Sequence, residues 1–66
     1  MRGYSPTERR LLQLMATEEM DDHQIAQQLG MSVVAMQNRR RIVIRKIGGR
    51  GKDDAVQIAR RLKLIN

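Results

Sequence analysis

The 66-residue chain lacks cysteine, phenylalanine and tryptophan, and it contains one tyrosine, one histidine and one proline. Without cysteine, the chain can form neither a disulfide nor a thiolate zinc site. A lone histidine does not make a metal site, and the sequence offers no nucleophile–base pair or paired carboxylates typical of an enzyme. We therefore expect no metal, no cofactor and no catalytic activity.

Long apolar runs are absent too. No stretch approaches the roughly 18 apolar residues of a membrane span, and the N-terminus lacks the apolar core of a signal peptide. We expect a cytoplasmic protein with no membrane partner. A chain of this length forms one domain with a small core, which must be aliphatic because large aromatic residues are missing.

The charges are sorted along the chain, whose formal net charge is +6. Between residues 23 and 52 there is no Asp or Glu. The basic residues in this segment are Arg39, Arg40, Arg41, Arg45, Lys46, Arg50 and Lys52. Acidic residues gather on either side of it, at 18–22 and 53–54. A basic segment without carboxylates predicts a polyanionic partner.

Local signals predict four helices, at about 6–17, 22–29, 32–47 and 52–64. Ser5, followed by Pro6 and Glu8, has the pattern of an N-cap, a first-turn proline and a capping box. The second helix begins at a cap supplied by Asp21 or Asp22 and ends at Gly30. Apolar residues recur at helical spacing in all four segments, so the expected fold class is all-α, a four-helix bundle.

The third segment is open to two interpretations, because its β-branched cluster IVI at 42–44 is also typical of a strand. A strand at this position would lack a partner, since no other segment has a strand pattern. A helix is favoured by the N-cap at Ser32, by the stop at Gly48, and by apolar residues at helical spacing. We therefore predict one helix, with an apolar face and a basic face.

Residues 21–41, DDHQIAQQLGMSVVAMQNRRR, have the layout of a helix-turn-helix, in which a short helix and a glycine-containing turn precede a longer helix. The second helix of this motif enters the major groove of DNA. Gln37, Asn38 and Arg41 have amide and guanidinium groups that suit base edges, and we expect them to contact bases. The expected phosphate contacts include Arg39, Arg40, Arg45, Lys46 and His23.

The chain also resembles the LuxR-type (GerE-like) helix-turn-helix domain of bacterial transcription regulators. The matching segments are SPTERRLLQLMA, HQIAQQLGMS, IRKIGGR and DDAVQIARRLKLI, which occur in the family's order from Tyr4 to Ile65. The resemblance implies that the third helix enters the major groove and that the fourth mediates dimerisation. The family's base-facing positions fall on Gln37, Asn38 and Arg41, and its phosphate-contacting positions on Ala35 and Arg39.

The sequence departs from the family pattern at several positions. Ala35 stands where threonine is usual, which removes a hydroxyl contact to phosphate, and Arg39 stands where histidine is common. Val33 and Val34 replace a pair such as Pro-Lys. The family usually carries an N-terminal sensor domain, and none is expected here.

These features predict a sequence-specific regulator of transcription that binds double-stranded DNA near the bacterial nucleoid as a homodimer on an inverted repeat. The apolar stripe of the fourth helix, Val56, Ala59 and Ile65, suits packing within one molecule, but apolar residues on more than one side of this helix favour a dimer interface. The residues expected there are Val56, Ala59, Arg60 and Lys63.

Other functions stay open at this point. A small helix-turn-helix protein can bind another regulator or RNA polymerase and modulate it, and the promoter-reading region of a sigma-like factor has a related fold. A basic amphipathic peptide that binds RNA or a membrane surface is a third class. The segment GGRGK has neither the spacing nor the preceding strand of a phosphate-binding loop.

Overall fold

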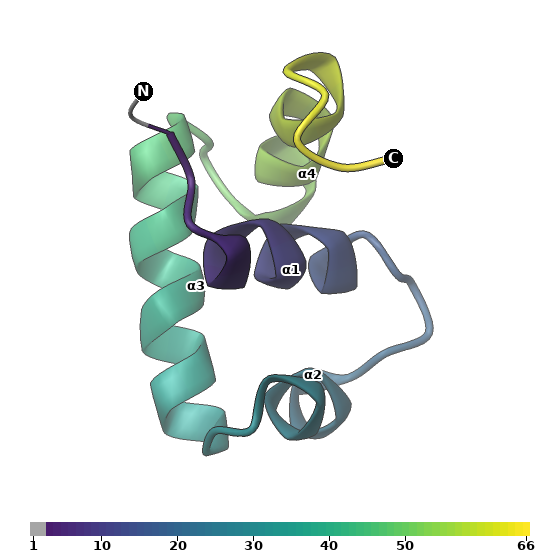
Figure 1. Ribbon diagram of the computed structural model, residues 1–66, viewed down its shortest axis with the longest axis vertical. Helices are drawn as coiled ribbons and strands as arrows, with labels where there is room; N and C mark the ends of the chain where they lie inside the picture. Colours follow the sequence, from purple (N-terminus) through teal and green to yellow (C-terminus); the bar gives the residue numbers. More distant parts are fainter. Residues whose placement is uncertain (1–2) are drawn as a thin grey trace.

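The computed structural model describes residues 3–66, which form four helices and no strand. The helices are α1 (Pro6–Met15), α2 (Asp22–Leu29), α3 (Val33–Ile47) and α4 (Lys52–Arg61). The predicted all-α fold class is confirmed. Figure 1 shows α3 as the longest helix along one side, with α2 beside its N-terminal end and α4 near its C-terminal end.

The helix starts follow the predicted caps. The Ser5 hydroxyl accepts a hydrogen bond from the N–H of Glu8 at 3.1 Å, and the Glu8 carboxylate accepts one from the N–H of Ser5 at 2.8 Å. Asp21 and Gln24 form the same reciprocal pair at the start of α2. Ser32 caps α3 by accepting from the N–H three residues on. Side-chain oxygens thus satisfy donors that the first helical turn leaves unpaired.

Two helices are shorter than predicted. The helix expected to reach residue 17 ends at Met15, because the N–H of Thr17 donates to the carbonyl of Leu14, three residues back, and tightens the last turn. The helix expected to reach residue 64 ends at Arg61. Beyond it, the N–H of Leu64 donates to the carbonyl of Ala59 at 2.9 Å, which turns the chain away from the helix axis.

The core is aliphatic, as predicted, and no buried side chain among residues 3–66 is polar or charged. All four helices contribute to it. Its buried members are Leu11, Leu12, Leu14, Met15, Ile25, Ala26, Met36, Val43, Ile47, Ala55, Val56, Ala59 and Ile65. Tyr4 packs against this cluster from outside. Within the described residues, no helix combines the length and the apolar character that crossing a bilayer requires.

A residue in the left-handed conformation follows three of the helices, and for two of them that residue is a glycine directly at the helix end. Gly30 follows α2 with φ of 68°, and Gly48 follows α3 with φ of 82°. After α4 the cap residue Leu62 is right-handed, and the left-handed residue is Lys63, one position further on, with φ of 60°. A side chain with a Cβ atom is strained in this conformation, so the end of α4 is the least favourable of the three.

We therefore expect Lys63→Gly to stabilise the protein by about 1 kcal/mol, because glycine relieves the strain of the left-handed backbone. Urea unfolding followed by circular dichroism measures the change. The matched control is Gln57→Gly, which places glycine at an exposed position inside α4 and should lower the free energy of unfolding by about 1 kcal/mol. A Lys63→Gly protein that unfolds at lower urea than the wild type contradicts the assignment.

Candidate functional site

The site is formed by α2, the turn at residues 30–32 and α3. Gly30 takes the left-handed conformation that lets the chain reverse after α2, and the N–H of Met31 closes the turn by donating to the carbonyl of Ala26 at 3.0 Å. Ser32, the last residue of the turn, is the N-cap of α3. The short connection places α2 across the N-terminal part of α3 (Figure 1).

The α3 helix has two faces. Met36, Val43 and Ile47 point into the core, which fixes the rotation of the helix about its axis. The side chains on the outward face are Val34, Asn38, Arg39, Arg41, Ile42 and Arg45, all of them exposed. Two of these are large and apolar, since 66% of Val34 and 60% of Ile42 is open to solvent. The outward face therefore combines hydrogen-bonding, cationic and apolar groups.

A carboxylate from α2 joins two α3 side chains at the α2–α3 junction. Arg40 donates from both terminal nitrogens to the two oxygens of Asp22, at 2.7 and 3.2 Å. The Nε2 of Gln37 donates to one of the same oxygens at 3.0 Å. The hydrogen bonds from Arg40 and then from Gln37 lower the pKa of Asp22 from 3.8 to about 2. The carboxylate is thus charged at neutral pH, and it accepts three hydrogen bonds.

The residues predicted to contact bases lie together on one stretch of α3 but differ in their surroundings. Asn38 and Arg41 are exposed, and the Arg41 guanidinium donates to the side-chain oxygen Oδ1 of Asn38 at 3.4 Å. Gln37 is half-buried and bonded to Asp22. Asn38 and Arg41 are therefore accessible to a ligand from outside, whereas one side of Gln37 is already occupied.

The residues predicted to contact phosphate divide into two groups. Arg39 and Arg45 are exposed on α3, His23 is exposed in the first turn of α2, and Ala35 is half-buried in the first turn of α3. Arg40 and Lys46 belong instead to intramolecular ion pairs.

Lys46 connects the C-terminal part of α3 to the start of α1. Its ammonium group donates to Glu8 at 2.9 Å and to the carbonyl of Gly3 at 3.1 Å, and it lies 4.7 Å from the centre of the Tyr4 ring. The hydrogen bond from Lys46, followed by that from the Ser5 backbone, lowers the pKa of Glu8. Lys46 is thus an anchor of α3 in this structure.

Two of the four residues expected at a dimer interface lie inside the monomer. Ala59 is fully buried and Val56 is 7% exposed, because α4 packs these side chains against the other helices and the tail folds back over the core at Ile65. In the monomer Ala59 offers no accessible surface to a second copy and Val56 offers little, so the dimer contacts expected at these two positions stay a prediction. Arg60 and Lys63 are exposed, as is Leu62 between them.

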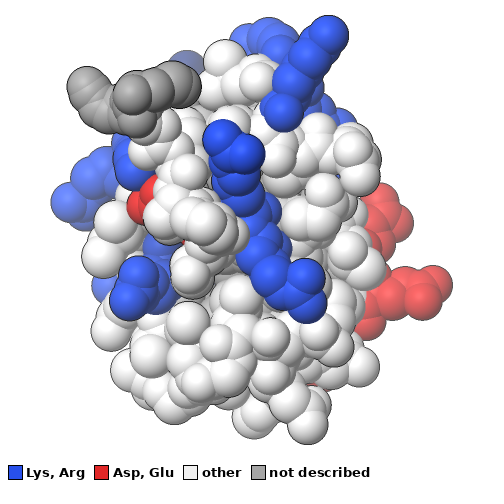
Figure 2. Space-filling model, viewed as in Figure 1, with Lys and Arg blue, Asp and Glu red and all other residues white. Residues whose placement is uncertain are grey.

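The charge of the surface is unevenly distributed. Figure 2 shows Lys and Arg atoms along the edge formed by α3 and around α4, with further basic atoms crossing the face over α1. The visible Asp and Glu atoms gather mainly at the opposite edge, beside the turn between α1 and α2. The α3 edge is therefore the side of this view that attracts a polyanion, and the α1–α2 turn repels one.

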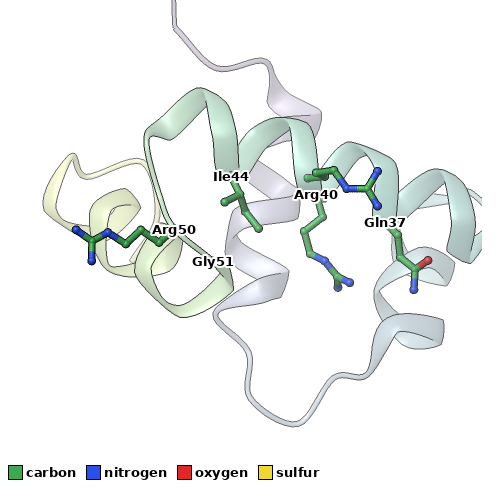
Figure 3. Close-up of a pocket in the computed structure, with 6 residues that line it drawn as sticks. Gln37, Arg40, Ile44, Arg50 and Gly51 are labelled. Carbon is green, nitrogen blue, oxygen red and sulfur yellow. The ribbon is translucent and has the colours of Figure 1, made fainter.

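A shallow pocket of about 350 Å³ lies beside α3. It is lined by Gln37, Arg40, Arg41, Ile44, Arg50 and Gly51. Figure 3 shows Gln37 and Arg40 extending to the same side of α3, while Arg50 points away from the pocket. Since Arg40 is held by Asp22 and Arg50 is directed elsewhere, their guanidinium groups do not converge on one anion. The pocket is a groove along the side of α3.

Two residues of the site, Asp22 and Val34, are not among the contacts predicted from the sequence. Asp22 was considered only as a helix cap, and nothing in its local sequence indicates that it contacts residues 15 and 18 positions away. Val34 has no apolar neighbour in the structure that would bury it, and helical spacing from Asn38 could have placed it on the outward face. No cluster of three or more potential metal ligands occurs within residues 3–66.

Comparison with protein families, with curated proteins and with solved structures finds no match to this chain.

The Asp22 contacts predict a dependence of stability on pH. A carboxyl group whose pKa is lowered by folding stabilises the protein above its unfolded pKa, and this contribution is lost as the pH falls through the folded pKa. For Asp22 the loss occurs between about pH 4 and pH 2. We expect the difference in free energy of unfolding between the wild type and Asp22→Asn to shrink across that range in urea titrations.

The Arg40→Ala variant serves as the control, because it removes the main cause of the lowered pKa and should lose the same pH-dependent contribution. A wild-type advantage over Asp22→Asn that stays constant from pH 4 to pH 2 contradicts the role of this ion pair.

Proposed function

We propose that the protein is a sequence-specific DNA-binding regulator of transcription, in which α2, the turn and α3 act as a helix-turn-helix. In this proposal α3 is the recognition helix and lies in the major groove, and α2 crosses above it. The observation that carries the proposal is the outward face of α3, where Asn38, Arg41 and Arg45 are exposed together without a neighbouring carboxylate on that helix.

The dimensions and chemistry of α3 support this function. Its 15 residues span about 22 Å at the rise of an α-helix, and the major groove of about 12 Å admits one helix. Arg41 suits the two acceptors of guanine, and Asn38 suits the acceptor and donor of adenine. Arg39 lies between these two residues in the sequence and Arg45 lies one turn beyond Arg41, and both are exposed for contact with phosphate.

The resemblance to LuxR-type domains supports the same assignment, because three of the matching segments cover most of α1, α2 and α4 and the fourth covers the C-terminal end of α3. Ala35 contributes its backbone and no hydroxyl group to a phosphate contact. The first turn of α3 should therefore bind the DNA backbone more weakly than it does in members with threonine at this position.

We further propose that the protein binds an inverted repeat as a homodimer through α4 and the residues that follow it. With Val56 and Ala59 in the core, the available side chains are Arg60, Leu62 and Lys63. Leu62 is 55% exposed and supplies an apolar contact at the centre of this surface. A symmetric pair would double the number of base contacts and so raise both affinity and specificity.

Selection of preferred duplexes from a random library tests the function directly. We expect one family of duplexes to be enriched, with binding that weakens steeply as the salt concentration rises. The Arg41→Ala variant should lose about 1–3 kcal/mol of discrimination at one base pair, measured as the ratio of dissociation constants for preferred and altered duplexes.

The control for charge is Arg61→Ala, which removes the same charge from α4 and should leave discrimination intact. Equal affinity of the wild type for selected and random duplexes would overturn the proposed function. A uniform loss across all duplexes in Arg41→Ala would instead assign Arg41 to phosphate.

Val34 generates a separate expectation, because an exposed apolar side chain at the start of a recognition helix suits the methyl group of thymine. Replacing individual thymines of the selected duplex with deoxyuridine should weaken binding at one position in the wild type. The same replacement should have no effect on Val34→Ala. Equal deoxyuridine penalties in the two proteins would exclude this contact.

A further inference from the structure

We propose that Asp22 is a positioning residue for DNA recognition: it orients the amide of Gln37 toward adenine and withholds Arg40 from the DNA backbone. The inference rests on the proposed function and deepens it. Asp22 would then favour discrimination between sequences at the expense of general affinity for DNA.

The geometry limits Gln37 to one orientation. An ionised carboxylate only accepts hydrogen bonds, so the amide nitrogen of Gln37 must face Asp22, as it does at 3.0 Å. If the amide flipped, its oxygen would face the Asp22 oxygens, and two acceptors would repel each other. The Gln37 oxygen is therefore directed away from Asp22, and the amide nitrogen retains one free N–H.

The groups that remain free on Gln37 match one base. Adenine presents the N6 amino donor and the N7 acceptor side by side in the major groove, and glutamine binds both through its oxygen and one N–H. A glutamine that rotates freely can present either end of its amide to either kind of edge. Once Asp22 holds it, the pairing with adenine costs less conformational entropy, and the competing orientation is unfavourable.

Arg40 is held by the same carboxylate. Its two terminal nitrogens both donate to Asp22, and only 20% of its side chain is exposed. A guanidinium in a bidentate pair has its charge balanced locally and its donors occupied. In this arrangement Arg40 does not displace counterions from DNA, unlike the exposed Arg39 and Arg45.

The position of Asp22 explains how a carboxylate can stand beside a surface proposed to bind a polyanion. Residues 23–52 contain no Asp or Glu, yet the fold brings Asp22 from outside this segment against α3. A carboxylate at this place repels phosphate, which disfavours binding to any DNA. In this proposal the hydrogen bond to Gln37 offsets that cost by making a specific contact more favourable.

The test compares the wild type with Asp22→Ala on the selected duplex and on random duplex, each over a range of salt concentrations. On random DNA, Asp22→Ala should bind several-fold more tightly, and its logarithmic salt slope should steepen by about 0.9, the value for one added phosphate contact by Arg40. Discrimination for adenine should fall roughly 5- to 150-fold at the base pair that Gln37 contacts. That base pair is the position where Gln37→Ala relaxes the preference.

Two further variants separate positioning from folding. In a Gln37→Ala background, Asp22→Ala should cause no additional loss of discrimination, because Asp22 acts through the glutamine. Asp22→Asn keeps an oxygen that can accept from Gln37, so it should retain more discrimination than Asp22→Ala while still binding random DNA more tightly. This second variant tests the proposal even if Asp22→Ala does not fold.

The control is Glu19→Ala, which makes the same change in net charge in the exposed α1–α2 turn. It should leave both the adenine preference and the salt slope at their wild-type values. If the wild type discriminates between duplexes and Asp22→Ala retains both the preference and the slope, Asp22 has no positioning role. If the wild type binds no duplex preferentially, the proposed function and this inference both fail.

Discussion

The packing of α3 is the constraint on which the rest of the structure depends. Met36, Val43 and Ile47 enter the aliphatic core from one side of this helix, and the small core offers no alternative apolar surface for them. Because these three positions fix the rotation of α3, they also determine which residues point outward. The exposure of Asn38 and Arg41 is therefore a consequence of core packing, and a substitution in the core would shift the outward face as well.

Two ion pairs tie α3 to the neighbouring helices and sort its basic residues. Asp22 holds Arg40 near the N-terminal part of the helix, and Glu8 holds Lys46 near its C-terminal part. Partly exposed pairs of this kind stabilise a protein only slightly. Their larger consequence is electrostatic. The two carboxylates neutralise two of the cations in a segment that contains no acidic residue of its own. Of the five cations on α3, Arg40 and Lys46 are paired, which leaves Arg39, Arg41 and Arg45 to meet a partner.

Local chemistry was sufficient to predict most of the fold. Ser5, Asp21 and Ser32 cap helices because side-chain oxygens near a helix start have few other partners, and such signals lie within four residues. The contacts of Asp22 with Gln37 and Arg40 span 15 and 18 residues, and periodicity defines the face of a helix without defining its neighbour. Val56 and Ala59 lie in an apolar stripe that suits either a core or a dimer interface, and helical spacing alone does not decide between the two.

If the protein binds DNA as proposed, the pairing of Arg40 and Lys46 affects the free energy of binding. At about 0.15 M salt, releasing the counterion of one phosphate contributes roughly 1 kcal/mol to binding, whatever the base sequence. One well-placed bidentate contact to a base contributes about 1–3 kcal/mol of discrimination. Removing Arg40 and Lys46 from the surface would therefore weaken general binding by about as much as one base contact adds to specific binding. Under the proposed function, a short basic chain would gain selectivity without adding residues, because the same carboxylate that pairs with Arg40 also accepts a hydrogen bond from Gln37.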